Sequence, residues 1–167
     1  MADEKIKKMI EDELFFFGEY SHSIDSQRRV AIPKNWRAKG SNLRFFLLPG
    51  RHKALQLIPF NSFKEIFEKI RKISFADPKA SLALAKLGSM AQECECDSQG
   101  RIAISPRLME EADLSDYAIM VGAISTAQIY SPDNWKKIAE SDESALDVVQ
   151  KIMEKPDDLA SILKGQI

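Results

Sequence analysis

Cysteine is scarce in this chain of 167 residues: Cys94 and Cys96 are its only two, and a single residue separates them. Two thiols this close cannot build the disulfide framework of a small secreted domain. No apolar run approaches the roughly 20 residues that a membrane-spanning helix needs. The charged segment from Met1 to Leu14 has no apolar core of the kind found in a secretory signal. We therefore expect a cytoplasmic protein without a membrane anchor.

The usual signatures of catalysis and metal binding are also missing from the sequence. It has no glycine-rich phosphate loop, no nucleophile elbow and no HExxH motif. His22 and His52 have no acid or nucleophile at a recognisable spacing. A structural zinc site needs four ligands, whereas Cys94 and Cys96 alternate with glutamates and are interpreted as core thiols. We therefore expect no enzyme activity, no metal, no cofactor and no small-molecule substrate.

What the chain does contain is an internal repeat at an offset of 72 residues. The first copy begins with Asp25 to Arg29 (DSQRR) and the second with Asp97 to Arg101 (DSQGR). We call these two segments the first and the second link. Each places an aspartate and an arginine four positions apart and runs into small and β-branched residues. The same offset, applied without a gap, aligns Phe45 with Tyr117. A repeat of this length predicts two similar halves.

The pattern of each half predicts strand, strand, short helix, strand, strand and a closing helix. The links have the chemistry of turns, because an aspartate can bond to the backbone two residues on and Gly100 can take a positive φ. Arg28 stands at the position of Gly100, which suggests that the first link needs no positive φ. Each half should therefore open with a short β-hairpin that carries the link at its tip.

Four short strands bury little apolar surface alone, so we expect the two halves to pair their open edges. The expected fold is α+β, a pseudo-symmetric small β-barrel built from the two repeats, with flanking helices. In chain order we expect an N-terminal tail or helix at 1–17, a first repeat at 18–66, a helical connection at 67–90, a second repeat at 91–138 and an acidic helical tail at 139–167.

Several residues have the chemistry of helix ends. Asn61, Ser105 and Ser131 are expected to cap helices, because their side chains can accept hydrogen bonds from the first turn. A further helix is expected to start at Asp77 and Pro78 and to be closed by Gly88. Residues 145–153 are expected to form an acidic helical piece.

Charge divides the two halves. The window from Glu19 to Lys53 has eight lysines and arginines and two acids, a net charge of +6. The equivalent window, Ala91 to Ser125, has two arginines and seven acids, a net charge of −5. Local charge decides what a surface attracts within a Debye length of about 8 Å. The first half should therefore attract polyanions and the second should not, although two merely solvated faces would carry the same charges.

The paired Asp-x-x-x-Arg signatures, Asp25 with Arg29 and Asp97 with Arg101, resemble those of the MraZ family, and each half resembles an AbrB/SpoVT swapped-hairpin module. The resemblance implies a sequence-specific DNA-binding regulator, usually a repressor, of the bacterial division and cell-wall gene cluster. It also implies a ring-like homo-oligomer on the nucleoid that binds promoter repeats in double-stranded DNA. The family's link is Ser-Lys-Gly, so the lysine is missing from both links here, and Arg28 is an added charge.

The DNA-binding residues expected from this pattern are Gln27, Arg28, Arg29, Lys34, Arg37 and Arg101. Arginine can contact guanine edges bidentately in the major groove, and Gln27 could contact adenine. Lys34, Arg37, Lys39 and Arg44 are better placed for phosphates, which supply affinity without sequence information.

Two alternatives to this interpretation stay open. Arg29 and Arg101 could serve only as ion-pair partners of Asp25 and Asp97. The acidic second half could also belong to a protein-interaction module, such as an antitoxin-like partner binder or an assembly scaffold, that does not bind DNA.

Overall fold

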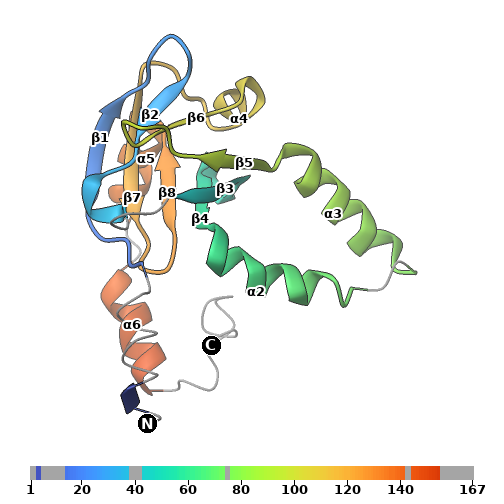
Figure 1. Cartoon of the computed structure of the whole chain (residues 1–167). Coiled ribbons are helices and arrows are strands. Elements are labelled where there is room, and N and C mark those ends of the chain that lie inside the picture. The colour runs from blue at the N-terminus through green and yellow to red at the C-terminus, as the bar shows by residue number, and fades with distance from the viewer. Residues whose placement is uncertain (1–2, 5–13, 38–42, 74–75, 142–143, 155–167) are drawn as a thin grey trace. The chain divides into compact units, whose positions relative to one another are not determined.

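The computed structural model describes residues 3–4, 14–37, 43–73, 76–141 and 144–154 (Figure 1). The chain divides into two compact units, residues 1–135 and 136–167. Every strand of the described chain belongs to the first unit. Most of the helix expected at the N-terminus, from Met1 to Leu14, lies outside the described residues, and so does the end of the expected acidic tail, from 155 onwards.

The first unit contains two sheets. The six strands of the larger sheet run in the order β1-β7-β8-β4-β3-β5, and β2 pairs with β6 in a separate two-stranded ribbon. The strands are β1 (Glu19–Ser23), β2 (Arg29–Ala31), β3 (Arg44–Pro49), β4 (Leu55–Pro59), β5 (Gln92–Glu95), β6 (Arg101–Ala103), β7 (Tyr117–Gly122) and β8 (Ala127–Tyr130). All of the pairs are antiparallel.

Helices follow the strands of both halves. The α-helices are α2 (Phe60–Ile70), α3 (Pro78–Met90), α4 (Pro106–Glu111), α5 (Pro132–Ala139) and α6 (Ala145–Glu154), with short 3-10 helices η1 (Lys34–Trp36) and η2 (Arg51–Lys53). The expected caps at Ser105 and Ser131 are confirmed, because each hydroxyl accepts a backbone N–H of its helix, at 3.3 and 3.1 Å. Asp77 likewise accepts from Lys79 and Ala80.

Two of the expected helix boundaries were wrong. The helix α2 begins at Phe60 and has Pro59 at its N-cap position, so Asn61 lies inside the helix and caps nothing. The helix α3 continues through Gly88 to Met90. A glycine weakens a helix interior by only about 1 kcal/mol relative to alanine, which is not enough to end a helix that is otherwise well formed.

The expected α+β fold with two repeats is confirmed in its class, but the barrel is not. Among the described residues, β1 and β5 are the two edges of the larger sheet, and they do not pair with each other. The strands that could have continued the sheet, β2 and β6, leave it at the two links and pair together. The sheet therefore stays open, and the ribbon is a separate element (Figure 1).

An approximate two-fold axis relates the two halves. Val30 faces Ile102 at the centre of the β2–β6 ribbon, and Gln56 faces Gln128 in the β4–β8 ladder. In both cases the two partners are each other's counterparts in the repeat. Of the six strand pairs, only β3–β4 and β7–β8 lie within one half. The halves are therefore interleaved and do not form two independent domains.

The repeat has a gap that the sequence offset did not reveal. In the β3–β5 ladder Phe45 faces Cys94, and in the equivalent β1–β7 ladder His22 faces Ala118. Because His22 is the counterpart of Cys94, the structural counterpart of Phe45 is Ala118. The alignment of Phe45 with Tyr117 was thus wrong by one residue. The β2–β6 and β4–β8 ladders keep the offset of 72, so the connecting loops absorb the difference.

Both halves contribute to one apolar core. The aromatic part comes from the first half, where Phe16, Trp36 and Phe45 are completely buried and the rings of Phe16 and Trp36 meet edge to face at 5.5 Å. The second half supplies aliphatic residues such as Leu108 and Ile129, which are also completely buried. Burial of this apolar surface is the main force that holds the interleaved halves together.

The segment before β1 joins the first half to the second. Phe16 donates its backbone N–H to the carbonyl of Ile124 at 2.8 Å, and Ile124 donates to Phe16 at 3.0 Å. Gly122 lies so close beneath this segment that an added Cβ would overlap the carbonyl of Phe16. The close approach of two backbones explains why a glycine stands there.

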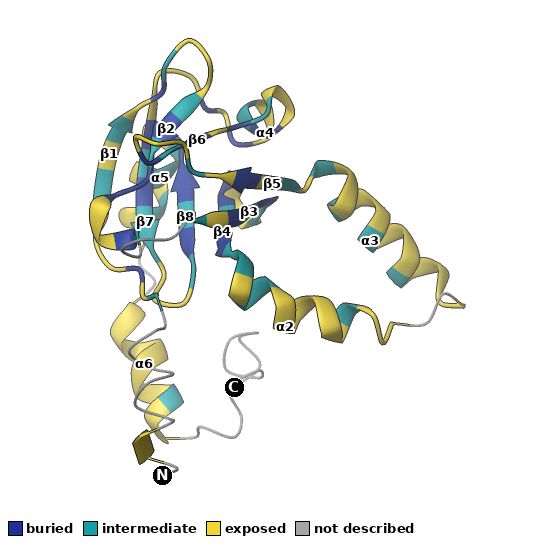
Figure 2. Ribbon diagram, viewed as in Figure 1, coloured by how far each residue is buried: buried dark blue, intermediate teal, exposed yellow. Residues whose placement is uncertain are grey.

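The pair α2 and α3 connects the halves and is largely exposed (Figure 2). Neither helix has a buried residue, and Ile66, Phe67 and Leu82 are exposed. The start of α2 is held to the sheet by Phe63, whose ring lies 4.1 Å from that of Phe46.

The second unit contains α6, and the expectation of a helix over 145–153 is confirmed. Its apolar residues Leu146, Val149 and Met153 are exposed. Within the part of the chain that the structure describes, no helix combines the length and apolarity needed to cross a membrane.

Candidate nucleic-acid interface

The first link is a compact turn organised by one carboxylate. Oδ1 of Asp25 accepts the backbone N–H groups of Gln27 and Arg29, both at 2.9 Å. The other oxygen, Oδ2, accepts from Nε of Arg29 at 2.7 Å. The backbone N–H of Arg28 donates to the carbonyl of Asp25 at 2.9 Å. A single aspartate thus fixes both the backbone of the link and the direction of the arginine side chain.

The second link repeats this arrangement almost atom for atom. Oδ1 of Asp97 accepts from the backbone of Gln99 and Arg101, both at 2.9 Å, and Oδ2 accepts from Nε of Arg101 at 2.9 Å. The N–H of Gly100 donates to the carbonyl of Asp97 at 3.0 Å. The expected pairing of each aspartate with its arginine is therefore present in both links.

Both links use a left-handed residue at their fourth position. Gly100 has φ +75° and Arg28 has φ +59°. The expectation that the first link needs no positive φ was thus wrong. The hydrogen bonds around Asp25 impose the same turn on either residue, and an L-residue with a side chain accepts it at a cost of about 1–2 kcal/mol.

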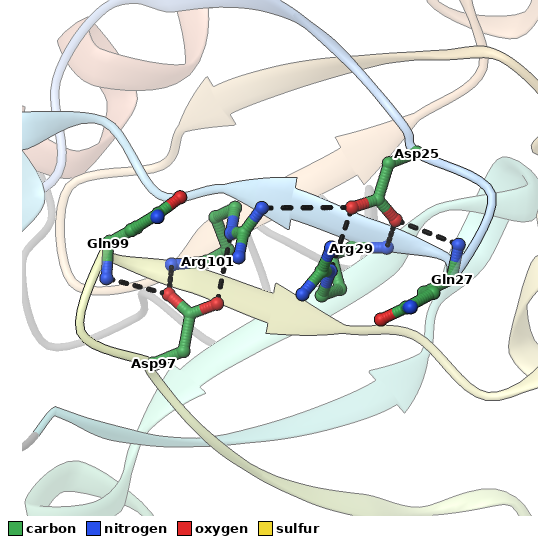
Figure 3. Close-up of polar contacts among 6 residues, drawn as sticks. All are labelled: Asp25, Gln27, Arg29, Asp97, Gln99 and Arg101. Carbon is green, nitrogen blue, oxygen red and sulfur yellow. Dashed lines mark hydrogen bonds and ion pairs between the residues drawn. The ribbon is translucent and has the colours of Figure 1, made fainter.

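The expected hairpins are also replaced by a different pairing. One backbone bond closes each link, from Asp25 to Arg29 at 3.1 Å and from Asp97 to Arg101 at 2.9 Å. Beyond the links the strands separate: β1 joins β7, β5 joins β3, and β2 joins β6. The two links consequently lie at opposite ends of one short ribbon (Figure 3).

The ribbon brings the two signature arginines together on one face. Val30 and Ile102 point into the core, whereas Arg29 and Arg101 are on the opposite, partly exposed face. Each arginine faces an alanine of the other strand, Ala103 and Ala31. Diagonal neighbours in an antiparallel pair lie about 7–8 Å apart. Both guanidinium groups therefore lie between the two aspartates, as Figure 3 shows.

The ion pairs of the cluster are not symmetric. Besides its bond to Asp97, Arg101 places Nη1 3.8 Å from Oδ2 of Asp25. Arg29 forms an ion pair with Asp25 alone among the described residues. Arg101 therefore joins the two links, whereas Arg29 belongs to one.

The surroundings stabilise both aspartates in their charged form. The pKa of Asp25 is lowered mainly by the backbone N–H of Arg29, and also by the Arg29 side chain and the backbone of Gln27, against an opposing effect of burial. The pKa of Asp97 is lowered in the same way by the backbone N–H and side chain of Arg101. Both carboxylates are thus ionised at neutral pH, and each engages an arginine through Nε.

This anchoring decides which donors remain available. A guanidinium has five N–H donors in a rigid fork, and an arginine bonded through Nε can still direct its Nη groups elsewhere. Planar forks of this kind match two acceptors of a guanine edge or a phosphate. The face of the ribbon therefore offers paired, oriented donors to an external acceptor.

The other expected DNA-binding residues have different surroundings. Gln27 and Lys34 are exposed, and Lys39 lies outside the described residues. Arg28 is exposed too, but its Nε donates to the carbonyl of Ile104 at 3.1 Å. Arg37 is half-buried and lies beside Gly100 of the other half. The structure thus gathers Arg29 and Arg101 on the ribbon and turns Arg37 toward the second link.

Two features of the site were not expected from the sequence. Gln99 is the exposed counterpart of Gln27, and the repeat offset could have identified it. Arg44 forms an ion pair with Glu93 across β3–β5, and its guanidinium lies 4.2 Å from the centre of the Phe60 ring. Arg44 was expected to contact phosphates, and no local pattern indicated this ion pair because the strand partner of β3 was unknown.

The cysteines have the core character that was expected. Cys94 is buried, and burial raises the pKa of its thiol to about 12. Burial likewise raises the pKa of Cys96, to about 11, although the nearby Arg37 opposes the shift. Thiols with such pKa values are poor nucleophiles at neutral pH. No cluster of three or more metal-ligating side chains occurs within the ranges that the structure describes.

Comparison with known proteins identifies the family. The family described as "MraZ protein, putative antitoxin-like" matches residues 15–86 and 88–153, one match for each repeat. A protein of Desulfitobacterium hafniense named transcriptional regulator MraZ is 35% identical over 130 residues, which cover 78% of this chain and 90% of the relative. Relatives of the same name occur in Alkaliphilus metalliredigens (31% identical, 84% of this chain, 97% of the relative) and Thermomicrobium roseum (36%, 75% and 87%).

These relatives have the names of regulators and not of enzymes, which agrees with the expectation that the chain is not an enzyme. The family matches cover both links and the strands that hold them, and extend into α6. The two Asp-x-x-x-Arg links, the interleaved halves and these matches lead to one conclusion: the chain belongs to the MraZ family.

Proposed function

We propose that this protein is a DNA-binding regulator of transcription that recognises promoter sequence through the β2–β6 ribbon. The observation that carries the proposal is the pair of Nε-anchored arginines, Arg29 and Arg101, on one accessible face. A two-stranded ribbon fits the major groove, where a guanidinium fork can contact O6 and N7 of guanine. The names of the relatives support a role in transcription.

The remaining residues contribute either to recognition of the base sequence or to affinity for the DNA backbone. Gln27 is exposed at the end of the ribbon, where an amide can bond to N6 and N7 of adenine. Arg28 and Lys34 are exposed cations of the basic half and are suited to phosphates. The charge of this half directs the duplex to the ribbon, while the acidic second half keeps the rest of the surface free of DNA.

A single ribbon makes few base contacts, so we propose that several copies bind consecutive promoter repeats. Linked binding events raise the effective affinity by about 10²–10⁴-fold without any new contact. The resemblance to the family suggests a ring-like homo-oligomer on the nucleoid that represses the division and cell-wall gene cluster. The exposed apolar residues of α2 and α3, Phe67 and Leu82 among them, suit a contact between copies.

The test is a binding titration of labelled promoter repeats with the full-length protein at two salt concentrations. Arg29→Ala should weaken DNA binding by about 1–3 kcal/mol. Arg29→Lys should keep the salt dependence of the wild type but lose its sequence preference. Arg107→Ala is the matched control, because Arg107 is an exposed arginine that bonds to the carbonyl of Ser89, away from the ribbon. Equal losses in Arg29→Ala and Arg107→Ala, or binding that ignores salt, would contradict the proposal.

A second candidate is an antitoxin-like module that binds another protein. The description of the family and the charge of −5 in the second half favour it. A protein that co-purifies with a stable partner and does not bind heparin would support this alternative. Retention on heparin, together with the loss of DNA binding in Arg29→Ala, would exclude it.

A further inference from the structure

Arg37 of the first half lies directly over the second link. Gly100 is buried in its left-handed turn, and a Cβ added there would overlap Nη1 of Arg37 and lie 2.6 Å from Cζ. The guanidinium thus occupies the space that a side chain at position 100 would need. Arg37 follows η1 directly, and its backbone N–H donates to the carbonyl of Lys34 at 3.1 Å, which fixes the start of the side chain.

The guanidinium of Arg37 has no hydrogen-bond or ion-pair partner among the described residues. Its Nε is completely buried and makes no hydrogen bond. The charge of Arg37 acts on the nearby thiol of Cys96, which stays protonated at neutral pH because burial raises its pKa to about 11. Buried polar groups are almost always hydrogen-bonded, and a cation without a partner is unfavourable. The remaining donors of Arg37 therefore call for an external anion.

The first link differs in this respect. Its fourth residue is Arg28, which carries its own guanidinium and satisfies Nε at the carbonyl of Ile104. The second link has no side chain at this position, and the repeat counterpart of Arg37 is the uncharged Met109. One arginine therefore stands at each link, but both arginines come from the first half.

We propose that Arg37 and the second link form one composite phosphate-binding position, which allows the acidic half to contact DNA through an arginine of the basic half. This inference rests on the proposed DNA binding. The ligand is a phosphate diester oxygen, because the accessible donors of Arg37 are a fork and Arg101 lies one residue beyond Gly100. Each subunit would then hold the duplex at both ends of its ribbon.

The experiment measures binding of labelled promoter repeats between about 50 and 200 mM salt. It compares the wild-type chain with four variants: Arg37→Gln, Arg37→Lys, Gly100→Ala and the double variant Arg37→Gln/Gly100→Ala. Arg37→Gln should weaken binding about tenfold and reduce the salt slope by about 1, whereas Arg37→Lys should keep the slope. Gly100→Ala should also weaken DNA binding, because its Cβ displaces Arg37. The double variant should bind DNA no more weakly than the single variant with the lower affinity.

The controls separate this inference from the proposed function. Arg107→Gln removes the same charge elsewhere and should change neither affinity nor slope. If Arg37→Gln binds like the wild type while Arg29→Ala still loses affinity, the composite position is wrong and the proposed function stands. If Arg29→Ala also binds like the wild type, both fail. Thermal unfolding confirms that each variant is folded, and stabilisation of the wild type by inorganic phosphate without DNA would indicate a free-anion site and overturn the inference.

Discussion

The two links have the same geometry in halves of opposite charge. Asp25 and Asp97 make the same set of hydrogen bonds, and both links hold a left-handed residue. Yet one link has Arg28 where the other has Gly100, in windows with net charges of +6 and −5. The difference teaches that the aspartate and the backbone determine the turn. The fourth residue is therefore free to vary in charge, as long as it accepts a positive φ.

The largest effect should come from the apolar core. Trp36 and Leu108 are repeat counterparts, and both are completely buried. Trp36→Ala should lower the free energy of unfolding by about 3–5 kcal/mol and Leu108→Ala by about 2–5 kcal/mol. The loss should be larger for Trp36→Ala, because the indole N–H of Trp36 also donates to the carbonyl of Phe17 at 2.9 Å. Urea unfolding measures the two losses, and Leu82→Ala, at an exposed position, is the control. A larger loss for Leu108→Ala than for Trp36→Ala would contradict the prediction.

The fourth position of each link should show the next largest difference. Gly100→Ala should destabilise by more than about 1 kcal/mol, because the new Cβ is strained at φ +75° and meets Arg37. Arg28→Gly should change the free energy of unfolding by less than about 1 kcal/mol, since relief of strain and the greater entropy of the unfolded chain oppose each other. Arg28→Ala is the control that keeps the strain. Equal losses at both positions would refute the equivalence of the two turns.

Alkaline pH should destabilise the fold through a buried thiol of the second half. Burial raises the pKa of Cys94 from 9.0 to about 12, so the folded state retains a proton that the unfolded state loses. The contribution is complete below about pH 9 and disappears as the pH rises toward 12, with a slope of up to about 1.4 kcal/mol per pH unit. The counterpart of Cys94 is His22, which has no thiol to ionise. Unfolding between pH 8 and 10.5 should show a shallower slope in Cys94→Ala; identical slopes would contradict the prediction.

The smallest effect should appear at acid pH. The lowered pKa values of Asp25 and Asp97 stabilise the fold above the ordinary carboxyl pKa of 3.8, and this contribution is lost as the pH falls through the lowered values. In a carbon-13 titration, Arg29→Ala should raise the pKa of Asp25 alone. Arg101→Ala should raise the pKa of both aspartates, because Arg101 approaches both. If the pKa of Asp25 did not change in Arg101→Ala, the 3.8 Å contact between Arg101 and Asp25 would not stabilise the carboxylate.

The sequence predicted what depends on neighbours in the chain. The aspartate turns, the pairing of Asp25 with Arg29 and the cap at Ser105 all rest on residues within four positions. It did not predict which strands pair, because β-propensity describes a strand and not its partner. The β2–β6 ribbon depends on pairs 70 to 74 residues apart, and the open sheet depends on other pairs that are distant in the sequence.

The candidate site was predicted to the same extent. Arg29 and Arg101 were identified as a pair of signatures, but their meeting on one face depends on the register of Val30 against Ile102. The position of Arg37 over Gly100 joins residues 63 apart, and no local pattern indicates such a contact. The left-handed turn at Arg28 was missed because a hydrogen-bond network imposed it and the residue type did not reveal it.

The interleaved pairing has a consequence for shorter versions of this molecule. A chain cut after residue 90 would keep β1 to β4, of which only β3 and β4 have each other as partners. Its β1, β2 and β4 would lack the neighbours that β7, β6 and β8 supply in the full chain. Because an approximate two-fold axis relates the halves, another copy of the same fragment could occupy those vacant places. Such a peptide would be expected to fold only in pairs, with concentration taking over the role of the covalent connection.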